Sequence, residues 1–144
     1  MSSINPNFIS KLRNKVVDTT IKILSHSNTK IAVLAARFLE EAIRYSVSGN
    51  DREKWTKEFV QVLNKIEKTI QTSNLDMLVL IQIAQSVSWH AHYATEETSS
   101  IAKRIITLLP NSLDLRTTLA FIDGFNILIE KLAWDARENE QNKL

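Results

Sequence analysis

The sequence predicts an all-α fold: a single domain, residues 1–144, built from six helices. Apolar residues recur with a period of 3.6 residues in six segments separated by short turn signals, which is the pattern of amphipathic helices. The chain contains only two glycines and two prolines, whereas β-sheet folds need many glycine-rich turns. Its 44% hydrophobic and 24% charged residues are typical of a globular domain with one core.

Residues 6–48 are expected to form the first helical hairpin. Asn5 and Pro6 predict the start of its first helix, because asparagine caps helix N-termini and proline is favoured at the first helical position. Gly49 predicts the end of the second helix. The apolar face of the first helix is expected to comprise Ile9, Leu12, Val16 and Ile23, with Val17 and Leu24 beside it. The second helix is expected to bury Ile31, Leu34, Ala35, Phe38, Ala42 and Tyr45, and it carries a second apolar stripe of Ala32, Ala36, Leu39, Ile43 and Val47.

Residues 51–93 are expected to form the second hairpin. Asn50 and Glu53 make a capping box, which predicts the start of the third helix. The apolar stripe of this helix recurs at steps of three and four residues and comprises Trp55, Phe59, Val62, Ile66 and Ile70. Ser73 or Asn74 is expected to cap the fourth helix, which is apolar on nearly all sides. Because such a helix must be covered all round, the fourth helix is predicted to be the central one.

Residues 95–138 are expected to form the third hairpin. Its first helix, the fifth of the chain, is predicted from Thr95 to just before Pro110, since the residue before a proline disfavours the helical conformation. The sixth helix is predicted to start at Asn111 or Ser112. Its core face is expected to comprise Leu115, Ile122, Phe125, Ile129, Leu132 and Ala136.

The sixth helix has two further features. It is expected to end near residue 138, which leaves a polar tail over residues 139–144. Gly124 lies within it, although a glycine there costs about 1 kcal/mol relative to alanine. This glycine can permit either a close approach of the fourth helix or a kink in the sixth. We expect packing, that is, the close approach, to be the reason for it.

The hairpins show an internal repeat. A shift of 46 residues aligns the turn Ser27-Asn28 with Ser73-Asn74, and shifts of 38 and 39 residues relate the second hairpin to the third. Two-helix units at this spacing resemble HEAT and armadillo-type repeats. The resemblance implies a right-handed α-solenoid in which the first, third and fifth helices form one layer and the others form the second. A closed six-helix bundle is the alternative.

The predicted function is that of a non-catalytic protein-interaction or adaptor module. In a HEAT-like stack the second helix of each hairpin lines the concave side, where partners dock. The outer face of the sixth helix adds apolar residues among charged ones, the composition of a binding surface, so another protein or a second copy in a homodimer is the expected partner. The candidate protein-binding residues are Arg37, Glu40, Glu41, Arg44, Gln82, Gln85, Arg116, Leu119, Asp123, Ile127, Glu130 and Trp134.

A lysine-rich face on the first and third helices supports an alternative function, the binding of a polyanion. Residues 1–72 hold 12 basic and 7 acidic residues, whereas the rest of the chain is net acidic. Such a surface suits nucleic acid or an anionic surface, although lysine is also the ordinary residue of a solvated helix face. The candidate polyanion-binding residues are Lys11, Lys15, Lys22, Lys54, Lys57, Lys65 and Lys68.

The sequence predicts no catalytic, cofactor-binding or metal-binding residues. There is no cysteine, so thiolate chemistry and disulfides are excluded, and two glycines cannot build a phosphate-binding loop. His90 and His92 are two residues apart, so on a helix they point in different directions and cannot bind one ion together. Residues 1–12 lack the apolar run of a secretory signal, and an intracellular, cytoplasmic location is expected. The acid-free composition of residues 1–17 leaves a transit peptide as the alternative.

Overall fold

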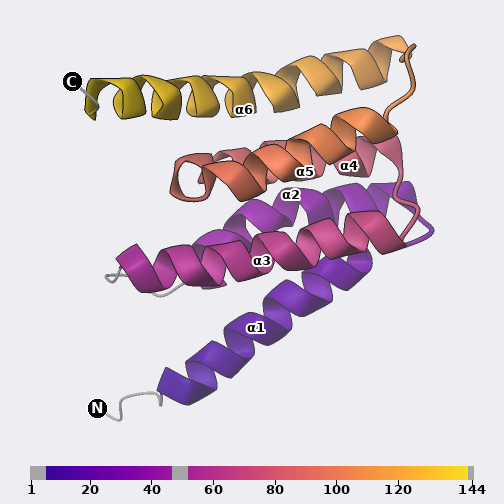
Figure 1. Cartoon of the computed structure of the whole chain (residues 1–144). Helices are drawn as coiled ribbons and strands as arrows, with labels where there is room; N and C mark the ends of the chain where they lie inside the picture. The colour runs from indigo at the N-terminus through magenta and orange to yellow at the C-terminus, as the bar shows by residue number, and fades with distance from the viewer. Residues whose placement is uncertain (1–5, 47–51, 143–144) are drawn as a thin grey trace.

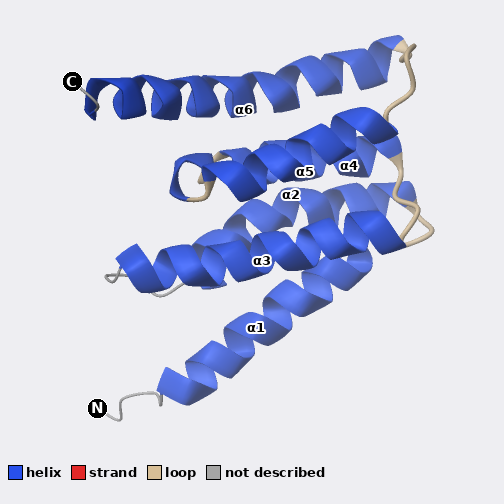
Figure 2. Cartoon of the chain, in the orientation of Figure 1, coloured by secondary structure: helices blue, strands red, loops and turns tan. Residues whose placement is uncertain are grey.

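The computed structural model of the protein describes residues 6–46 and 52–142 (Figure 1). Within these residues the chain forms six α-helices and one 3-10 turn and contains no β-strand, which confirms the all-helical prediction (Figure 2). The elements are α1 (Pro6–Ile23), α2 (Thr29–Ser46), α3 (Arg52–Thr72), α4 (Met77–Ser88), the turn η1 (Ala91–Tyr93), α5 (Thr95–Leu108) and α6 (Leu115–Asn142). None of the described helices is long and apolar enough to cross a membrane.

Helices α2, α4 and α6 pack side by side in that order, with α4 in the middle. On the other side of the molecule α3 contacts both α1 and α5, and α1 also packs along α2 (Figure 1). Helix α4 is covered on nearly all sides, since Val79, Ile83, Ala84 and Val87 are at most 1% exposed. Its uniformly apolar sequence therefore correctly predicted the central, most buried helix.

Two helices begin later than the sequence suggested. Helix α4 is capped by Asp76, whose carboxylate accepts a hydrogen bond of 2.9 Å from the backbone N–H of Leu78. The predicted caps Ser73 and Asn74 lie before this turn. A carboxylate at the N-cap is favoured because it satisfies a free N–H group and interacts with the positive end of the helix dipole.

Helix α6 begins at Leu115, and Asn111 and Ser112 precede it. The cap is Asp114, whose carboxylate accepts a hydrogen bond of 2.7 Å from the N–H of Thr117. This hydrogen bond lowers the pKa of Asp114 below its usual value. The helix extends to Asn142, so residues 139–142 of the predicted polar tail are helical. Three other predicted end signals, Asn5, Gly49 and Asn50, lie outside the described residues.

The buried faces of α1 and α2 differ from the predicted ones. In α1, Leu12 and Val16 are exposed, while Val17, Ile21 and Leu24 are buried. In α2 the predicted main stripe is exposed at Ile31, Leu34 and Phe38 and buried only at its alanines, Ala35 and Ala42. The second stripe is buried at Ala32, Ala36, Leu39 and Ile43. Small alanine side chains allow neighbouring helix axes to approach closely, so the alanine side of α2 faces α1 and α4. Four further residues were predicted to be in the core, but their side chains are outside the part that the structure describes: Ile9, Tyr45, Val47 and Leu132.

The buried face of α3 is the predicted one, whereas α6 is rotated about its axis relative to the predicted orientation. Phe59, Val62, Ile66 and Ile70 of α3 are buried and Trp55 is half-buried. In α6 the predicted core residue Phe125 is buried, but Leu115, Ile122, Ile129 and Ala136 are exposed, and Thr117, Gly124 and Leu128 are buried instead.

Gly124 accounts for this rotation of α6. A Cβ atom at Gly124 would lie 3.1 Å from the carbonyl oxygen of Ile81 and 3.5 Å from Cβ of Gln85, both on α4. The glycine side of α6 therefore faces α4, as its sequence position predicted, and the close contact turns Ile122 and Ile129 outward.

Candidate functional site

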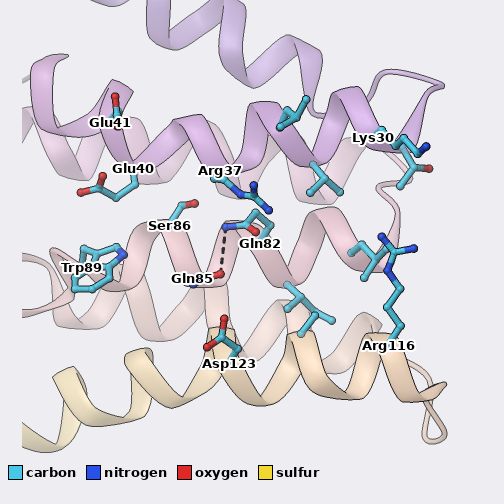
Figure 3. Close-up of a pocket in the computed structure, with 16 residues that line it drawn as sticks. Lys30, Arg37, Glu40, Glu41, Gln82, Gln85, Ser86, Trp89, Arg116 and Asp123 are labelled. Atoms are coloured by element: carbon cyan, nitrogen blue, oxygen red, sulfur yellow. Dashed lines mark hydrogen bonds between the residues drawn. The ribbon is translucent and has the colours of Figure 1, made fainter.

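A groove of about 1030 Å³ runs along one side of the row formed by α2, α4 and α6 (Figure 3). This volume is at the upper end of the roughly 300–1,000 Å³ of small-molecule sites. The apolar lining comes from all three helices and comprises Val33, Leu34, Leu78, Ile81, Trp89 and Ala120. The polar lining comprises Thr29, Lys30, Arg37, Glu40, Glu41, Gln82, Gln85, Ser86, Arg116 and Asp123.

Close packing holds the three helices of the groove together. The buried hydroxyl of Ser86 on α4 donates a hydrogen bond of 2.6 Å to the carbonyl oxygen of Ala36 on α2. On the other side of α4, Gly124 brings α6 against Ile81. Within the groove the side-chain amide of Gln82 donates to Gln85 at 3.2 Å. The concave surface is therefore built on rigid helices.

The charged residues of the groove are unevenly distributed along it. Lys30 and Arg116 lie at one end, and Glu40 and Glu41 lie at the other, beside Trp89 (Figure 3). The groove thus has a basic end and an acidic end, and Arg37 and Asp123 lie between them (Figure 3). Such a distribution favours a ligand whose own charges are opposed from end to end.

Glu40 is held in place at the acidic end. Its side chain is only 14% exposed and accepts a hydrogen bond of 2.6 Å from the guanidinium of Arg44. The Nε2 atom of His90 lies 3.6 Å from the same carboxylate oxygen, which is longer than a hydrogen bond. Burial lowers the pKa of His90, and the nearby Glu40 carboxylate opposes this shift only in part. His90 is therefore neutral at pH 7.

An aromatic cluster supports this end of the groove from beneath. The ring of His90 lies edge-on to Trp55, with ring centroids 5.2 Å apart, and Tyr93 lies 4.6 Å from the same tryptophan. Phe59 completes the contact at 5.1 Å from Trp55. Rings at these distances and angles attract each other beyond the effect of burial alone. The cluster joins α3 to the end of α4 and fixes the position of His90 under Glu40.

Seven of the twelve predicted protein-binding residues line the groove, namely Arg37, Glu40, Glu41, Gln82, Gln85, Arg116 and Asp123. Arg44 lies next to it through its ion pair with Glu40. The structure does not bring Leu119, Ile127, Glu130 or Trp134 into the groove. Leu119, Glu130 and Trp134 are exposed elsewhere on α6, and Ile127 is half-buried.

Sequence reasoning missed the apolar residues of the groove. Leu34 was assigned to the core, and Val33, Ile81 and Trp89 were not assigned to a site. One signal was available, since Val33 lies one helical turn from both Lys30 and Arg37 and therefore shares their side of α2.

The seven lysines of the alternative prediction are all exposed on α1 and α3. Lys65 donates a hydrogen bond of 2.9 Å to Asp18 across the two helices, and Lys57 lies 3.7 Å from Glu53. The two helices approach each other at their C-terminal ends and diverge toward their N-terminal ends (Figure 1). The N-terminal half of α1, which carries Lys11 and Lys15, therefore lies apart from the start of α3 (Figure 1).

The structure places His90 and His92 beyond the end of α4, where His92 belongs to the turn η1 and contacts Tyr93. In the part of the chain that the structure describes, no group of three or more histidine, cysteine, aspartate or glutamate side chains is arranged to hold a metal ion. No family model matches the sequence, and no curated protein and no solved structure is significantly similar to it.

Proposed function

We propose that this chain is a non-catalytic protein-interaction module whose groove binds a helical segment of another protein. The observation that carries the proposal is the groove itself, which combines an apolar floor with a basic end and an acidic end. Apolar contacts supply affinity and charges at the rim supply orientation, which is how helix-in-groove recognition works.

The order of the helices supports a HEAT-like arrangement for this module. Helices α2, α4 and α6, the second members of the three hairpins, pack in one row, and α3 contacts α1 and α5. In a right-handed solenoid of three hairpins the groove would be the concave side of this row. A closed bundle would bring the first and last helices together, but α1 and α6 lie at opposite ends of the molecule (Figure 1).

The dimensions and charges of the groove define the partner. Helix α4, which forms the floor, has 12 residues and is about 18 Å long, so a partner helix of about three turns spans it. An apolar stripe on that helix would contact Val33, Leu78 and Ile81. Acidic side chains at one end would face Lys30 and Arg116, and basic side chains at the other would face Glu41.

Trp89 is the residue from which we expect the largest contribution to binding. Its side chain is 46% exposed in the free protein and lines the acidic end of the groove. A partly exposed tryptophan beside charged groups is the typical anchor of an interface, where its loss costs about 2 kcal/mol or more. Trp134 offers a matched control, because it is also exposed but does not line the groove.

The test is a selection of helical peptides from a displayed library, followed by titration of the selected peptides. We expect peptides with an apolar stripe, acidic residues at one end and basic residues at the other. Trp89→Ala should weaken binding by about 30-fold, as 2 kcal/mol implies, and Trp134→Ala should leave it unchanged. Arg37→Glu should also weaken it, whereas Lys103→Glu on the exposed side of α5 should not. Binding that depends on Trp134 and not on Trp89 would overturn the proposal.

A further inference from the structure

Helix α6 carries a regular apolar seam on its outward face, on the side away from Gly124. Its large members are Leu115, Leu119, Ile122 and Ile129, which are 76%, 58%, 58% and 64% exposed. One polar residue and two alanines complete the row. We call the whole row the α6 seam, and it comprises Leu115, Leu119, Ile122, Asn126, Ile129, Ala133 and Ala136. Large apolar side chains so exposed in one continuous row indicate a surface that another chain covers.

The spacing of the α6 seam is that of a coiled coil. Its positions follow each other at alternating steps of four and three residues, so Leu119, Asn126 and Ala133 occupy heptad position a and the remaining four occupy position d. The seam extends over about three heptads, roughly 33 Å at 1.5 Å per residue. Three heptads are the shortest repeat that indicates a coiled coil.

We propose that the α6 seam pairs with the same seam of a second copy of this chain, with the two helices parallel and in register. Asn126 is the only polar residue of the seam and is exposed. In a parallel, in-register pair it lies opposite Asn126 of the second copy, where the two amides can hydrogen-bond to each other. A single asparagine at an a position is known to select this register, because every other register leaves it against apolar side chains.

The charges beside the seam do not select the parallel arrangement, which rests on Asn126. Arg116, Asp123, Glu130 and Arg137 are exposed and occupy the e positions along one flank. An antiparallel partner would place this row against itself. The antiparallel heptad registers mix like and opposite charges: the register that places Asp123 opposite its own copy also places Arg116 opposite Glu130, whereas the register that places Asp123 opposite Glu130 opposes only like charges.

The parallel pair brings no two charged residues together along this flank. There the e row faces the g positions of the second copy, which include Thr118 and Phe125. Both residues are uncharged and lie toward the body of the domain, so no like charges meet. The inference rests on α6 and not on the proposed function, since none of the seam residues lines the groove.

The first test is the mass of the full chain in solution, measured by light scattering over a range of concentrations. We expect twice the chain mass of 16.4 kDa. Ile122→Glu should yield the single mass, because it places a charge in the apolar seam, and its exposed position should leave the fold intact by circular dichroism. The proposal is overturned if the wild-type protein has the single mass at every concentration of a series that spans 100-fold.

The matched control is Phe38→Glu on α2. Phe38 is also an exposed apolar residue, but it belongs to the opposite end of the row of helices. We expect this variant to remain a dimer. If it becomes monomeric as well, the copies associate head to tail through both ends, and the α6 pairing is wrong.

The register is tested by a single introduced cysteine, since the chain has none of its own. Leu119→Cys should form a disulfide-linked dimer under mild oxidation, because the two thiols face each other in the parallel pair. The exposed control Lys103→Cys on α5 should remain monomeric on a denaturing gel. Antiparallel pairing of Leu119 with Ile129 would separate the thiols by about 15 Å, so absence of the disulfide in a dimer overturns the parallel register.

Discussion

Substitution of Gly124 tests the packing of α6 against α4 most directly. An added Cβ atom would lie 3.1 Å from the Ile81 carbonyl oxygen and 3.3 Å from its Cγ2 atom, which is closer than ordinary contact. The backbone of Ile81 is part of a buried helix and cannot move alone. The two helices must therefore separate by a few tenths of an ångström, which weakens their contact along its length.

The expected magnitude follows from two opposing effects. Gly124→Ala gains about 1 kcal/mol of helix propensity and loses a comparable amount to the forced separation, so we expect a net change in unfolding free energy close to zero. Gly124→Val adds two further methyl groups at the same contact and has a poorer helix propensity than alanine. We expect it to destabilise the protein by about 2–3 kcal/mol.

Urea unfolding followed by circular dichroism measures these changes, at a single protein concentration because a dimer makes the midpoint concentration-dependent. Asn64→Ala is the control for helix propensity, since Asn64 is exposed within α3 and should gain about 0.6 kcal/mol without a clash. The reasoning is refuted if Gly124→Ala gains its full propensity and Gly124→Val remains within about 0.5 kcal/mol of the wild type.

Three further changes test other parts of the structure by the same unfolding measurement. Ser86→Ala removes the buried hydrogen bond to Ala36 and should cost about 1 kcal/mol; no loss would mean that this bond does not hold α2 to α4. Asp76→Ala should lower the unfolding free energy by about 1 kcal/mol because it removes the cap of α4, and Asn74→Ala should lower it much less. A larger loss from Asn74→Ala would instead support the helix start that the sequence predicted. Burial lowers the pKa of His90, so the unfolded chain binds more protons just below pH 6.5 and stability should fall as the pH drops from 7 to 5.5. His90→Gln should reduce this slope, and an unchanged slope would contradict the buried, neutral state.

Part of the candidate site was predictable from the sequence. The polar residues along α2 and α4 were identified because residues three and four apart share one side of a helix, which holds for any helix whatever its surroundings. Arg37, Glu41 and Gln82 accordingly do line the groove. The groove's depth and its floor were not predictable, because Val33, Ile81 and Ala120 come from three separate helices and line one groove only when these are packed together.

The sequence by itself determined the number of helices, the burial of α4 and the close approach of α4 to α6 at Gly124. These features depend on local periodicity, on uniform apolarity and on the one glycine within α6, none of which requires knowledge of the neighbours. Only the tertiary structure decided which apolar stripe is buried where a helix has two. On α2 the alanines and on α6 Gly124 face the neighbouring helices, because small residues permit the closest approach of helix axes. The larger residues Leu34, Phe38, Ile122 and Ile129 are consequently left exposed.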